Sequence, residues 1–290
     1  MSITHRFARV RRLGRLRLVV NAIRLAVSLL VSACFGVPLY LALVNVFKTN
    51  EQILAAPVAL PAPVTMDNLI AVLTGNGPDY WGPMVNSVVI VVPSLAGTIV
   101  LGSMIGYYLG RSTGLASRLM QGLLLIGLML PFQVLLLPLS VILKTLGLQG
   151  SYLGLILFNI AFYVPFAGFV YARFMKTVPF ELEEAAALDG AGRLRTFVQV
   201  VVPLLRPTSA SILIFVGVWI WNDFLNPLVI LGPGAGSTIT TGIYRSIGQF
   251  NTDFGTMFAF TLLAALPVLA FFFAMQDRFV AGLASGATKG

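Results

Sequence analysis

Residues 84–109 read MVNSVVIVVPSLAGTIVLGSMIGYYL, a run of 26 residues without a charged side chain. An α-helix rises 1.5 Å per residue, so about 20 apolar residues are enough to cross the roughly 30 Å hydrocarbon core of a bilayer. Lipid offers no hydrogen-bond partners, so a run of this length must satisfy its own backbone groups by forming a helix. The stretch therefore predicts a membrane-spanning helix.

Runs of similar length occur along the whole chain, and only one of them, which contains Asp223, carries a charged residue. Hydrophobic residues make up 58% of the sequence and charged residues 10%, more apolar material than a soluble domain of 290 residues can bury. We expect an all-α integral membrane protein with six transmembrane helices. The predicted spans cover about 25–47, 84–109, 119–143, 152–171, 208–231 and 254–275.

Every predicted span has a proline within it or near its end. These prolines are Pro38, Pro93, Pro131, Pro138, Pro165, Pro227 and Pro267. Proline removes a backbone hydrogen bond and kinks a helix, and membrane helices tolerate this where neighbours or water satisfy the freed carbonyl. Bent helices suit a pathway that opens and closes, although proline is also common in membrane helices generally. The small residues Gly97, Gly102 and Gly106 predict close helix packing.

The distribution of positive charge predicts the orientation of the chain, because Lys and Arg residues near spans are retained on the cytoplasmic side. With the N-terminus inside, 16 of the 19 Lys and Arg residues are cytoplasmic, and Lys48, Lys144 and Arg245 lie outside. Both termini are therefore predicted to be cytoplasmic. The expected organisation is a basic cytoplasmic head at 1–24, a six-span permease domain at 25–283 and a cytoplasmic tail at 284–290.

Several functional classes are disfavoured by composition. The net charge of +9 is explained by topology and by contact of the Arg-rich head with anionic lipid, so no nucleic-acid partner is expected. Cys34 is the only cysteine, which excludes an intrachain disulfide, and the only histidine, His5, lies in the head. We therefore expect no catalytic residue and no metal site. A secondary transporter would need more intramembrane acids or cations than Asp223 alone.

Two connections between spans are long. The outer connection, 48–83, is rich in Pro and Gly and is long enough to meet an external partner. Within it, residues 66–73 predict a short amphipathic helix at the membrane interface. The cytoplasmic connection, 173–207, is where the charge density rises.

The cytoplasmic connection predicts two helices joined by a turn. Residues 181–190 read ELEEAAALDG, in which the acids of the first turn complement the positive end of a helix. Gly190 is expected to take the left-handed conformation that ends this helix, and Gly192 to turn the chain into a second helix that runs to Pro203. The three alanines give the first helix a face small enough for another protein's backbone to contact.

The run Glu184, Ala185, Ala186, followed by Gly190 and by VVVP at 200–203, resembles the EAA loop of ABC importer permeases. In that family this loop is the coupling helix that docks on a cytoplasmic ATPase subunit. The family pattern usually has Ile and Leu where this chain has Val200 and Val202, a conservative difference. The resemblance implies a coupling helix between spans four and five. The ATPase-coupling residues that it implies are Glu183, Glu184, Ala185, Ala186, Asp189 and Gly190.

Other stretches are similar to the carbohydrate group of this family, and especially to maltose-type permease subunits of the second kind. They are Asn86-Ser87, the stretch 219–224 (WIWNDF) with Pro227, and the ending 282–290. The resemblance implies a multi-pass protein of the prokaryotic cytoplasmic (inner) membrane. Its implied partners are a second homologous permease, two ABC ATPase subunits and an extracytoplasmic sugar-binding protein, besides membrane lipid.

No phosphate-binding loop is present, so this chain is expected to bind no cofactor, and ATP and Mg are expected on the partner ATPase subunits. The predicted function is translocation of a sugar or related polyol by alternating access. The alternative is a permease of the same importer family for another solute class, such as an amino acid, a polyamine or a phosphonate.

Residues in the fourth and fifth spans are candidates for the substrate path. A charge is costly within a membrane and normally faces a cavity or a partner, and tryptophan rings beside amides suit a sugar. The alternative is that the tryptophans anchor the outer interface, while Asp223 is solvated or caps a broken helix. The candidates are Trp219, Trp221, Asn222, Asp223, Tyr163 and Asn159.

Overall fold

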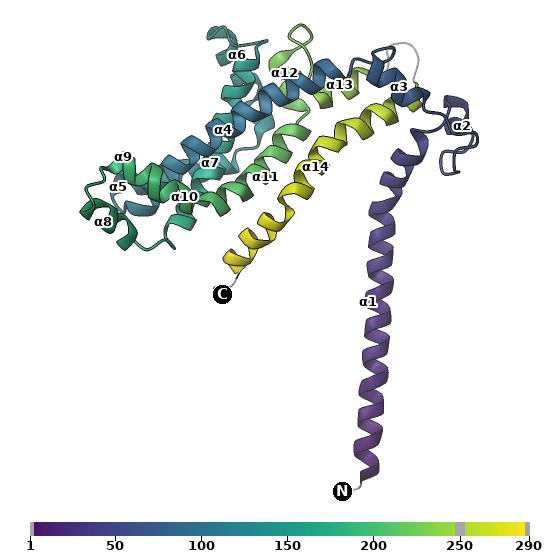
Figure 1. The fold of residues 1–290 in the computed structure, drawn as a ribbon, viewed down its shortest axis with the longest axis horizontal. Helices are drawn as coiled ribbons and strands as arrows, with labels where there is room; N and C mark the ends of the chain where they lie inside the picture. The colour runs from purple at the N-terminus through teal and green to yellow at the C-terminus, as the bar shows by residue number, and fades with distance from the viewer. Residues whose placement is uncertain (1–2, 247–252, 288–290) are drawn as a thin grey trace. The chain divides into compact units, whose positions relative to one another are not determined.

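The computed structural model describes the backbone of residues 3–246 and 253–287, and the side chains of residues 20–246 and 253–275 (Figure 1). Every regular element in these ranges is a helix, which confirms the predicted all-α class. The chain forms two compact units. One contains Met1–Gly77 and Thr252–Leu262, and the other contains Pro78–Asn251 and Leu263–Gly290.

The first unit is organised by the side chain of Asn68. Its elements are α1 (Ile3–Asn45), α2 (Asn50–Ala55), α3 (Asp67–Thr74) and the first residues of α14 (Phe254–Ala287). The Asn68 amide donates hydrogen bonds of 2.8 Å to the carbonyls of Val46 and Lys48, and so fixes α3 against the end of α1. The predicted helix at 66–73 is therefore present, as α3.

Lys48 connects the end of α1 to the chain that follows α2. Its side chain is buried, and its Nζ donates to the carbonyls of Ala56 and Pro57 at 2.9 and 3.2 Å. Burial lowers the pKa of this ammonium group, because leaving water disfavours its charged form. The two carbonyls replace part of the lost hydration and hold the chain after α2 beside the end of α1.

Helix α1 is a single uninterrupted element that includes both the predicted head and the first span. Its stretch Val20–Asn45 is long and apolar enough to cross a membrane, and large side chains along it, such as Leu30 and Phe35, are more than two-thirds exposed. The head at 3–24 is therefore helical and continuous with the span, and the side chains of residues 1–19 lie outside the described ones.

The second unit is built around α4 (Trp81–Arg111) and α7 (Tyr152–Met175), which pack against each other along most of their length (Figure 1). Helices α8 and α9 lie at one end of this unit, and α12 lies at the other (Figure 1). The further elements are α5 (Leu115–Met129), α6 (Phe132–Thr145), α8 (Glu181–Leu188), α9 (Arg193–Thr196), η1 (Phe197–Val201), α10 (Val202–Leu204), α11 (Arg206–Asn222), α12 (Leu225–Leu231), α13 (Ile239–Ser246) and the remainder of α14.

Glycines on one face of α4 make its contact with α7 possible. A Cβ atom added at Gly102 would lie 2.6 Å from the Cβ atom of Ala167, and one added at Gly106 would lie 2.2 Å from that of Tyr171. Residues four apart share a helix face, so these positions form a continuous small-residue stripe. The close packing predicted from these glycines is confirmed.

Four helices in the described part of the chain are long and apolar enough to cross a membrane. The total reaches six if each of two bent helix pairs counts as one span. The four stretches are Val20–Asn45, Trp81–Arg111, Tyr152–Met175 and Phe254–Met275. The described part of the predicted tail, 284–287, continues α14, whereas Lys289 and Gly290 lie outside the described residues.

The predicted third span, 119–143, is not a continuous helix. Helix α5 ends at Met129 and α6 begins at Phe132, with an angle of 104° between them. Leu130 has an extended backbone with ψ of 119°, because the ring of Pro131 disfavours the helical conformation of the residue before it. The proline was recognised in the sequence, but it breaks the helix rather than kinking it.

The predicted fifth span, 208–231, is also interrupted. Helix α11 ends at Asn222, Asp223 is extended with φ of −68° and ψ of 126°, and α12 begins at Leu225. A second bend, of 70°, separates the stretch Arg193–Leu204 from α11. Pro207 stands in the first turn of α11, where its missing N–H group is tolerated.

Substituting Gly106 by Ala should destabilise the second unit by about 1–3 kcal/mol, because the new methyl group forces α4 away from α7. The measurement is the melting temperature of the purified protein in detergent. The control is Gly122→Ala in α5, where an added Cβ atom meets nothing within 4 Å. The control should be neutral or stabilising, by up to about 1 kcal/mol. Equal effects of the two substitutions would contradict the role of the glycine stripe.

Candidate functional site: the loop between α7 and α11

Helix α8 has the acidic first turn and the glycine end that the sequence predicts, although it begins at Glu181 and not at the Thr177–Pro179 segment. Three acids occupy its first turn, and at its end Gly190 has a φ of +79°. The N–H of Ala191 donates to the carbonyl of Ala186 at 2.9 Å, and that of Gly190 to Ala187 at 3.0 Å. These two hydrogen bonds form a Schellman motif, which satisfies carbonyls at the helix end and requires the left-handed residue that glycine supplies.

The second helix of the loop contains a wide turn that the sequence did not predict. Gly192 caps α9 with an extended backbone, and the N–H of Val202 then donates to the carbonyl of Phe197, five residues earlier. Pro203 has no N–H, and its ring displaces the carbonyl four residues before it. The chain relaxes into a π turn, the arrangement in which hydrogen bonds span five residues.

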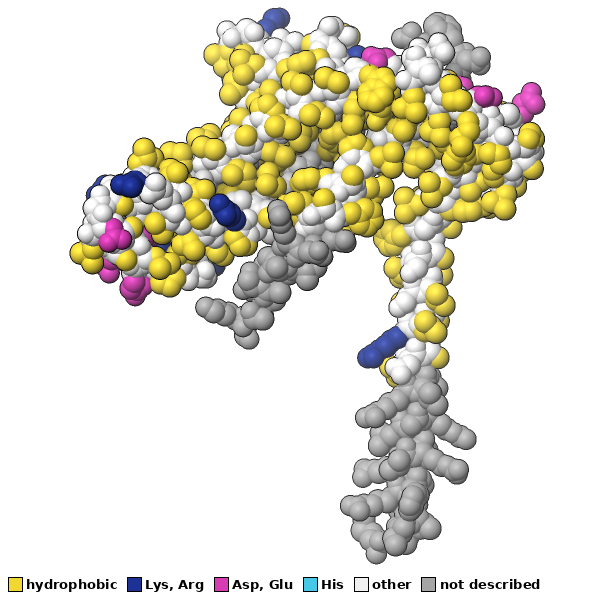
Figure 2. Space-filling view, viewed as in Figure 1, with side chains coloured by type: hydrophobic (Ala, Val, Ile, Leu, Met, Phe, Trp, Pro, Cys, Tyr) yellow, Lys and Arg dark blue, Asp and Glu magenta, His cyan; other side chains and the backbone are white. Residues whose placement is uncertain are grey.

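The outer surface of the loop is a mixture of small, acidic and apolar side chains. Ala185 and Glu184 are exposed, and Leu188 is 90% exposed. On the second helix, Leu194 and Val198 are also exposed. Figure 2 shows acidic and basic side chains gathered at this end of the unit, beside hydrophobic ones. Apolar side chains this exposed, with charges around them, are typical of a surface that binds another protein.

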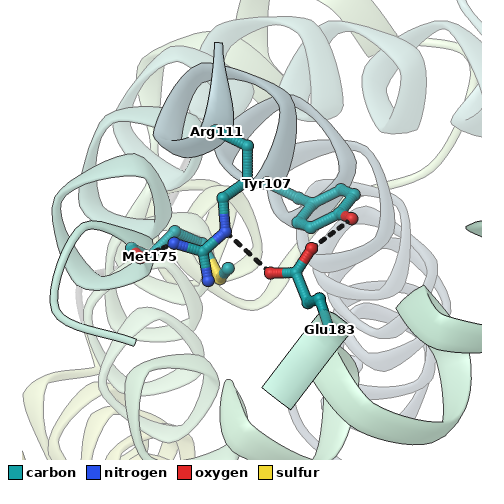
Figure 3. A network of polar contacts seen from close by, with 4 residues as sticks. All are labelled: Tyr107, Arg111, Met175 and Glu183. Carbon is teal, nitrogen blue, oxygen red and sulfur yellow. Dashed lines mark hydrogen bonds and ion pairs between the residues drawn. The ribbon is translucent and has the colours of Figure 1, made fainter. Parts of the chain in front are cut away.

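Glu183 differs from the other predicted ATPase-coupling residues, because its side chain points into the protein and is only 7% exposed (Figure 3). Its Oε1 accepts a hydrogen bond of 2.7 Å from Nε of Arg111, and its Oε2 accepts one of 2.7 Å from the hydroxyl of Tyr107. Arg111 Nη1 also donates to the carbonyl of Met175 at 2.9 Å. The carboxylate thus links α8 to the end of α4, and Arg111 links the end of α4 to that of α7.

The partners of Glu183 were missed by sequence reasoning. Arg111 was counted only as a cytoplasmic charge, and Tyr107 was not singled out. The available signal was the position of Arg111 at the end of a charge-free run, on the same side of the membrane as the acidic loop. The guanidinium also lies over the ring of Phe180, 5.6 Å from its centroid, which fixes it further at the start of α8.

Two of the six substrate-path candidates are brought together by the structure. The rings of Tyr163 and Trp219 are stacked, with centroids 5.9 Å apart and planes 23° from parallel. Phe166 meets Trp219 edge-on at 5.1 Å. Tyr163 is buried, whereas Trp219 is 44% exposed, so the indole forms the surface of this aromatic group.

The other four candidates make contacts within the protein. Trp221 faces α14, donating to the carbonyl of Ala264 at 3.3 Å, and lines an apolar cavity of about 180 Å³ between α4, α11 and α14. Asn222 bonds the carbonyl of Val218 in its own helix. Asn159 is buried, and its amide donates to Ser94 in α4 at 3.3 Å.

Asp223 is the last of the six candidates. Its Oδ1 accepts a hydrogen bond of 3.2 Å from the N–H of Asn226, and its Oδ2 accepts one from the amide of the same residue. Its own carbonyl accepts from the hydroxyl of Thr240 at 2.6 Å. Asp223 therefore caps the broken helix, as the alternative interpretation of this residue expected.

Comparison with known proteins identifies the family of the chain. Residues 98–285 match the family model of the binding-protein-dependent transport system inner membrane component, which is more than half of the chain. The chain belongs to this family. It is therefore a permease component of a binding-protein-dependent importer, the non-catalytic membrane part, and a multi-pass protein of the cytoplasmic membrane. The predicted resemblance to importer permeases is confirmed.

Several permeases are similar to the chain over most of their length. The multiple sugar-binding transport system permease protein MsmG of Streptococcus mutans is 33% identical over 258 residues, which is 87% of this chain and 91% of that protein. The diacetylchitobiose uptake system permease protein NgcG of Streptomyces coelicolor is 33% identical, over 91% of this chain and 88% of that protein. The glucose import system permease protein GlcU of Saccharolobus solfataricus is 30% identical, over 88% and 90%.

A solved structure has the same fold. It is a bacterial ABC transporter involved in the import of the acidic polysaccharide alginate, and one of its chains matches with a TM-score of 0.79 at 17% identity. The match covers 92% of this permease and 98% of that chain. At this identity the likeness establishes the fold, which is that of an ABC transporter permease.

Substituting Gly190 by Ala should destabilise the turn after α8, because a side chain with φ near +79° costs about 1–2 kcal/mol in the left-handed region. The measurement is the rate of limited proteolysis between α8 and α9 in membranes. Gly192→Ala is the matched control, since Gly192 has an ordinary φ of −72° and an added Cβ atom meets nothing within 4 Å at either position. Similar cleavage rates for the two variants would contradict the conformational requirement at Gly190.

Proposed function

We propose that the chain is one of two membrane subunits of an ATP-driven importer that moves a sugar or related polyol into the cell by alternating access. The observation that carries the proposal is helix α8, which presents Glu184, Ala185 and Leu188 outward at one end of the second unit. A short exposed helix with small side chains lets a partner's backbone come into van der Waals contact. It is the element through which this permease meets its ATPase.

The proposed membrane topology has six spans with both termini in the cytoplasm. The third span is the bent pair α5 with α6, and the fifth begins with α11, which follows the α9–α10 stretch of the cytoplasmic loop after a bend of 70°. The positive charge supports this orientation, because flipping the chain would place 16 of its 19 Lys and Arg residues outside. In this topology the loop with α8 is cytoplasmic, as docking on an ATPase requires.

The proposed assembly contains this permease, a second homologous permease, two ABC ATPase subunits and an extracytoplasmic binding protein. The family description supports the binding protein, since transport in it is binding-protein-dependent. ATP and Mg are bound by the ATPase subunits and not by this chain. Closure of the ATPase pair on ATP moves the docked helices together, and the outer ends of the spans open to receive substrate.

The proposed substrate class rests on relatives and on an aromatic surface. The similar permeases are named for the transport of multiple sugars, glucose and diacetylchitobiose. The Tyr163–Trp219 stack offers an exposed indole face, and the faces of sugar rings carry C–H groups that pack on aromatic rings. We place the substrate path along this face, because Trp221, Asp223 and Asn159 are engaged in contacts with other residues of the protein.

Introducing a positive charge by Glu184→Lys, or bulk by Ala185→Leu, should abolish substrate-stimulated ATP hydrolysis in the purified complex in lipid. Each change alters the outward surface of α8 that the ATPase contacts. Ala116→Leu, at an exposed alanine of α5, is the control for added bulk and should retain stimulation. Full stimulation in both loop variants, with the complex assembled, would show that α8 is not the coupling element.

Replacing Trp219 by Ala should lower transport at low sugar concentration by about tenfold, the effect of losing roughly 1.4 kcal/mol of ring stacking. Trp219→Phe keeps an aromatic face and should retain most activity. Uptake of labelled sugars, amino acids and polyamines by vesicles containing the complex measures this. If sugar uptake is unchanged in Trp219→Ala, Trp219 does not line the substrate path. If the vesicles take up only amino acids or only polyamines, the assignment to sugars is wrong.

A further inference from the structure

The covalent connection between α7 and α8 is short and mostly exposed. Of residues 176–180, only Val178 is buried, and the other four are exposed. The N–H groups of Thr177 and Val178 donate to the carbonyls of Phe174 and Met175, so the start of the connection follows α7. Side-chain contacts between α8 and the membrane helices add a direct route for movement of α8 to reach them.

A second attachment is provided by Glu183. Its two carboxylate oxygens each accept one hydrogen bond of 2.7 Å, one from Arg111 and one from Tyr107, both on α4 (Figure 3). Two acceptors on one rigid group fix both the position and the orientation of α8. Hydrogen bonds to charged groups are shorter and stronger than neutral ones, and this pair is largely shielded from water.

Arg111 extends the attachment to a third helix, because its Nη1 donates to the carbonyl of Met175, the last residue of α7. The helices that receive this contact are themselves closely packed, through the small-residue stripe that includes Gly102 and Gly106. A force applied to α8 therefore acts on α4 and α7 together. These two helices form the centre of the second unit.

We propose that Tyr107, Arg111 and Glu183 form a mechanical linkage that transmits displacement of α8 to the packed pair α4 and α7. The inference rests on the proposed function, in which α8 docks on the ATPase. It gives Glu183 a role different from that of its neighbour Glu184. Glu184 faces the partner, whereas Glu183 is a positioning residue that passes the partner's movement into the membrane.

The chemistry of the linkage determines which variants break it. A glutamine at position 183 keeps the shape and can still form hydrogen bonds, but it removes the negative charge that pairs with Arg111. A lysine at position 111 keeps the charge but lacks the planar fork that reaches both Glu183 and the Met175 carbonyl. Exchanging the charges, with Arg111→Glu and Glu183→Arg together, restores an ion pair between the same two helices.

The test uses the complete complex in proteoliposomes and measures assembly together with substrate transported per ATP hydrolysed. Glu183→Gln and Arg111→Gln should lower this ratio by about tenfold, as expected for losing a charge-assisted contact. Arg111→Lys should lower it less, and the exchanged pair should restore it in part. Arg118→Gln removes an exposed arginine seven residues further along the chain and should leave the ratio unchanged.

An unchanged ratio in assembled Glu183→Gln and Arg111→Gln complexes would overturn the linkage. Glu184→Lys, measured in parallel, separates this result from failure of the docking proposal. If only Glu184→Lys loses coupling, the docking proposal stands and the linkage proposal is wrong. If no variant loses coupling, both proposals are wrong.

If Glu183→Gln or Arg111→Gln prevents assembly of the complex, two further measurements still test the linkage. Tyr107→Phe removes one hydrogen bond and no charge, and should lower the ratio by a smaller factor than Glu183→Gln. Coupling restored by the exchanged pair would support the linkage. If neither Tyr107→Phe lowers the ratio nor the exchanged pair restores it, the linkage is overturned.

Discussion

The close contact between α4 and α7 is the constraint on which the second unit depends. In a bilayer, helices gain little from hiding apolar side chains, since lipid is equally apolar, so packing and polar contacts must hold them together. Gly102 and Gly106 remove the side chains that would keep the two backbones apart. Helices α5, α11, α12 and α13 then pack on one or the other member of this pair.

Polar side chains connect this pair to other elements at both of its ends. At one end Glu183 gathers Tyr107 and Arg111. At the other end, Asn86 donates to the carbonyl of Ser237 at 3.0 Å, and Ser87 accepts from the N–H of Ile239 at 2.8 Å. The Asn86-Ser87 pair, noticed as a family-like feature of the sequence, thus holds the segment that leads into α13. At both ends, these polar side chains contact elements that are distant in the sequence.

The sequence was sufficient for features that depend on local chemistry. Charge-free runs predicted the long helices, and Gly190 predicted the end of α8, because its left-handed backbone is a property of a few neighbouring residues. It was insufficient for features that depend on contacts between residues distant in the sequence. The three acids at the start of α8 look alike in sequence, and only the position of Arg111, 72 residues away along the chain, selects Glu183 for burial. Likewise, Pro131 was visible, but whether a proline kinks or breaks a helix depends on what packs on either side.

The π turn at 197–201 affects how this loop is compared with its relatives. A π turn contains one more residue than an α turn, so it has the same effect on a helix as a single-residue insertion. Side chains before and after it are offset by about 100° from their places in an uninterrupted helix. The stretch Arg193–Leu204 therefore has two helical phases, and a helical wheel drawn across it would assign Leu194 and Val202 to incorrect faces.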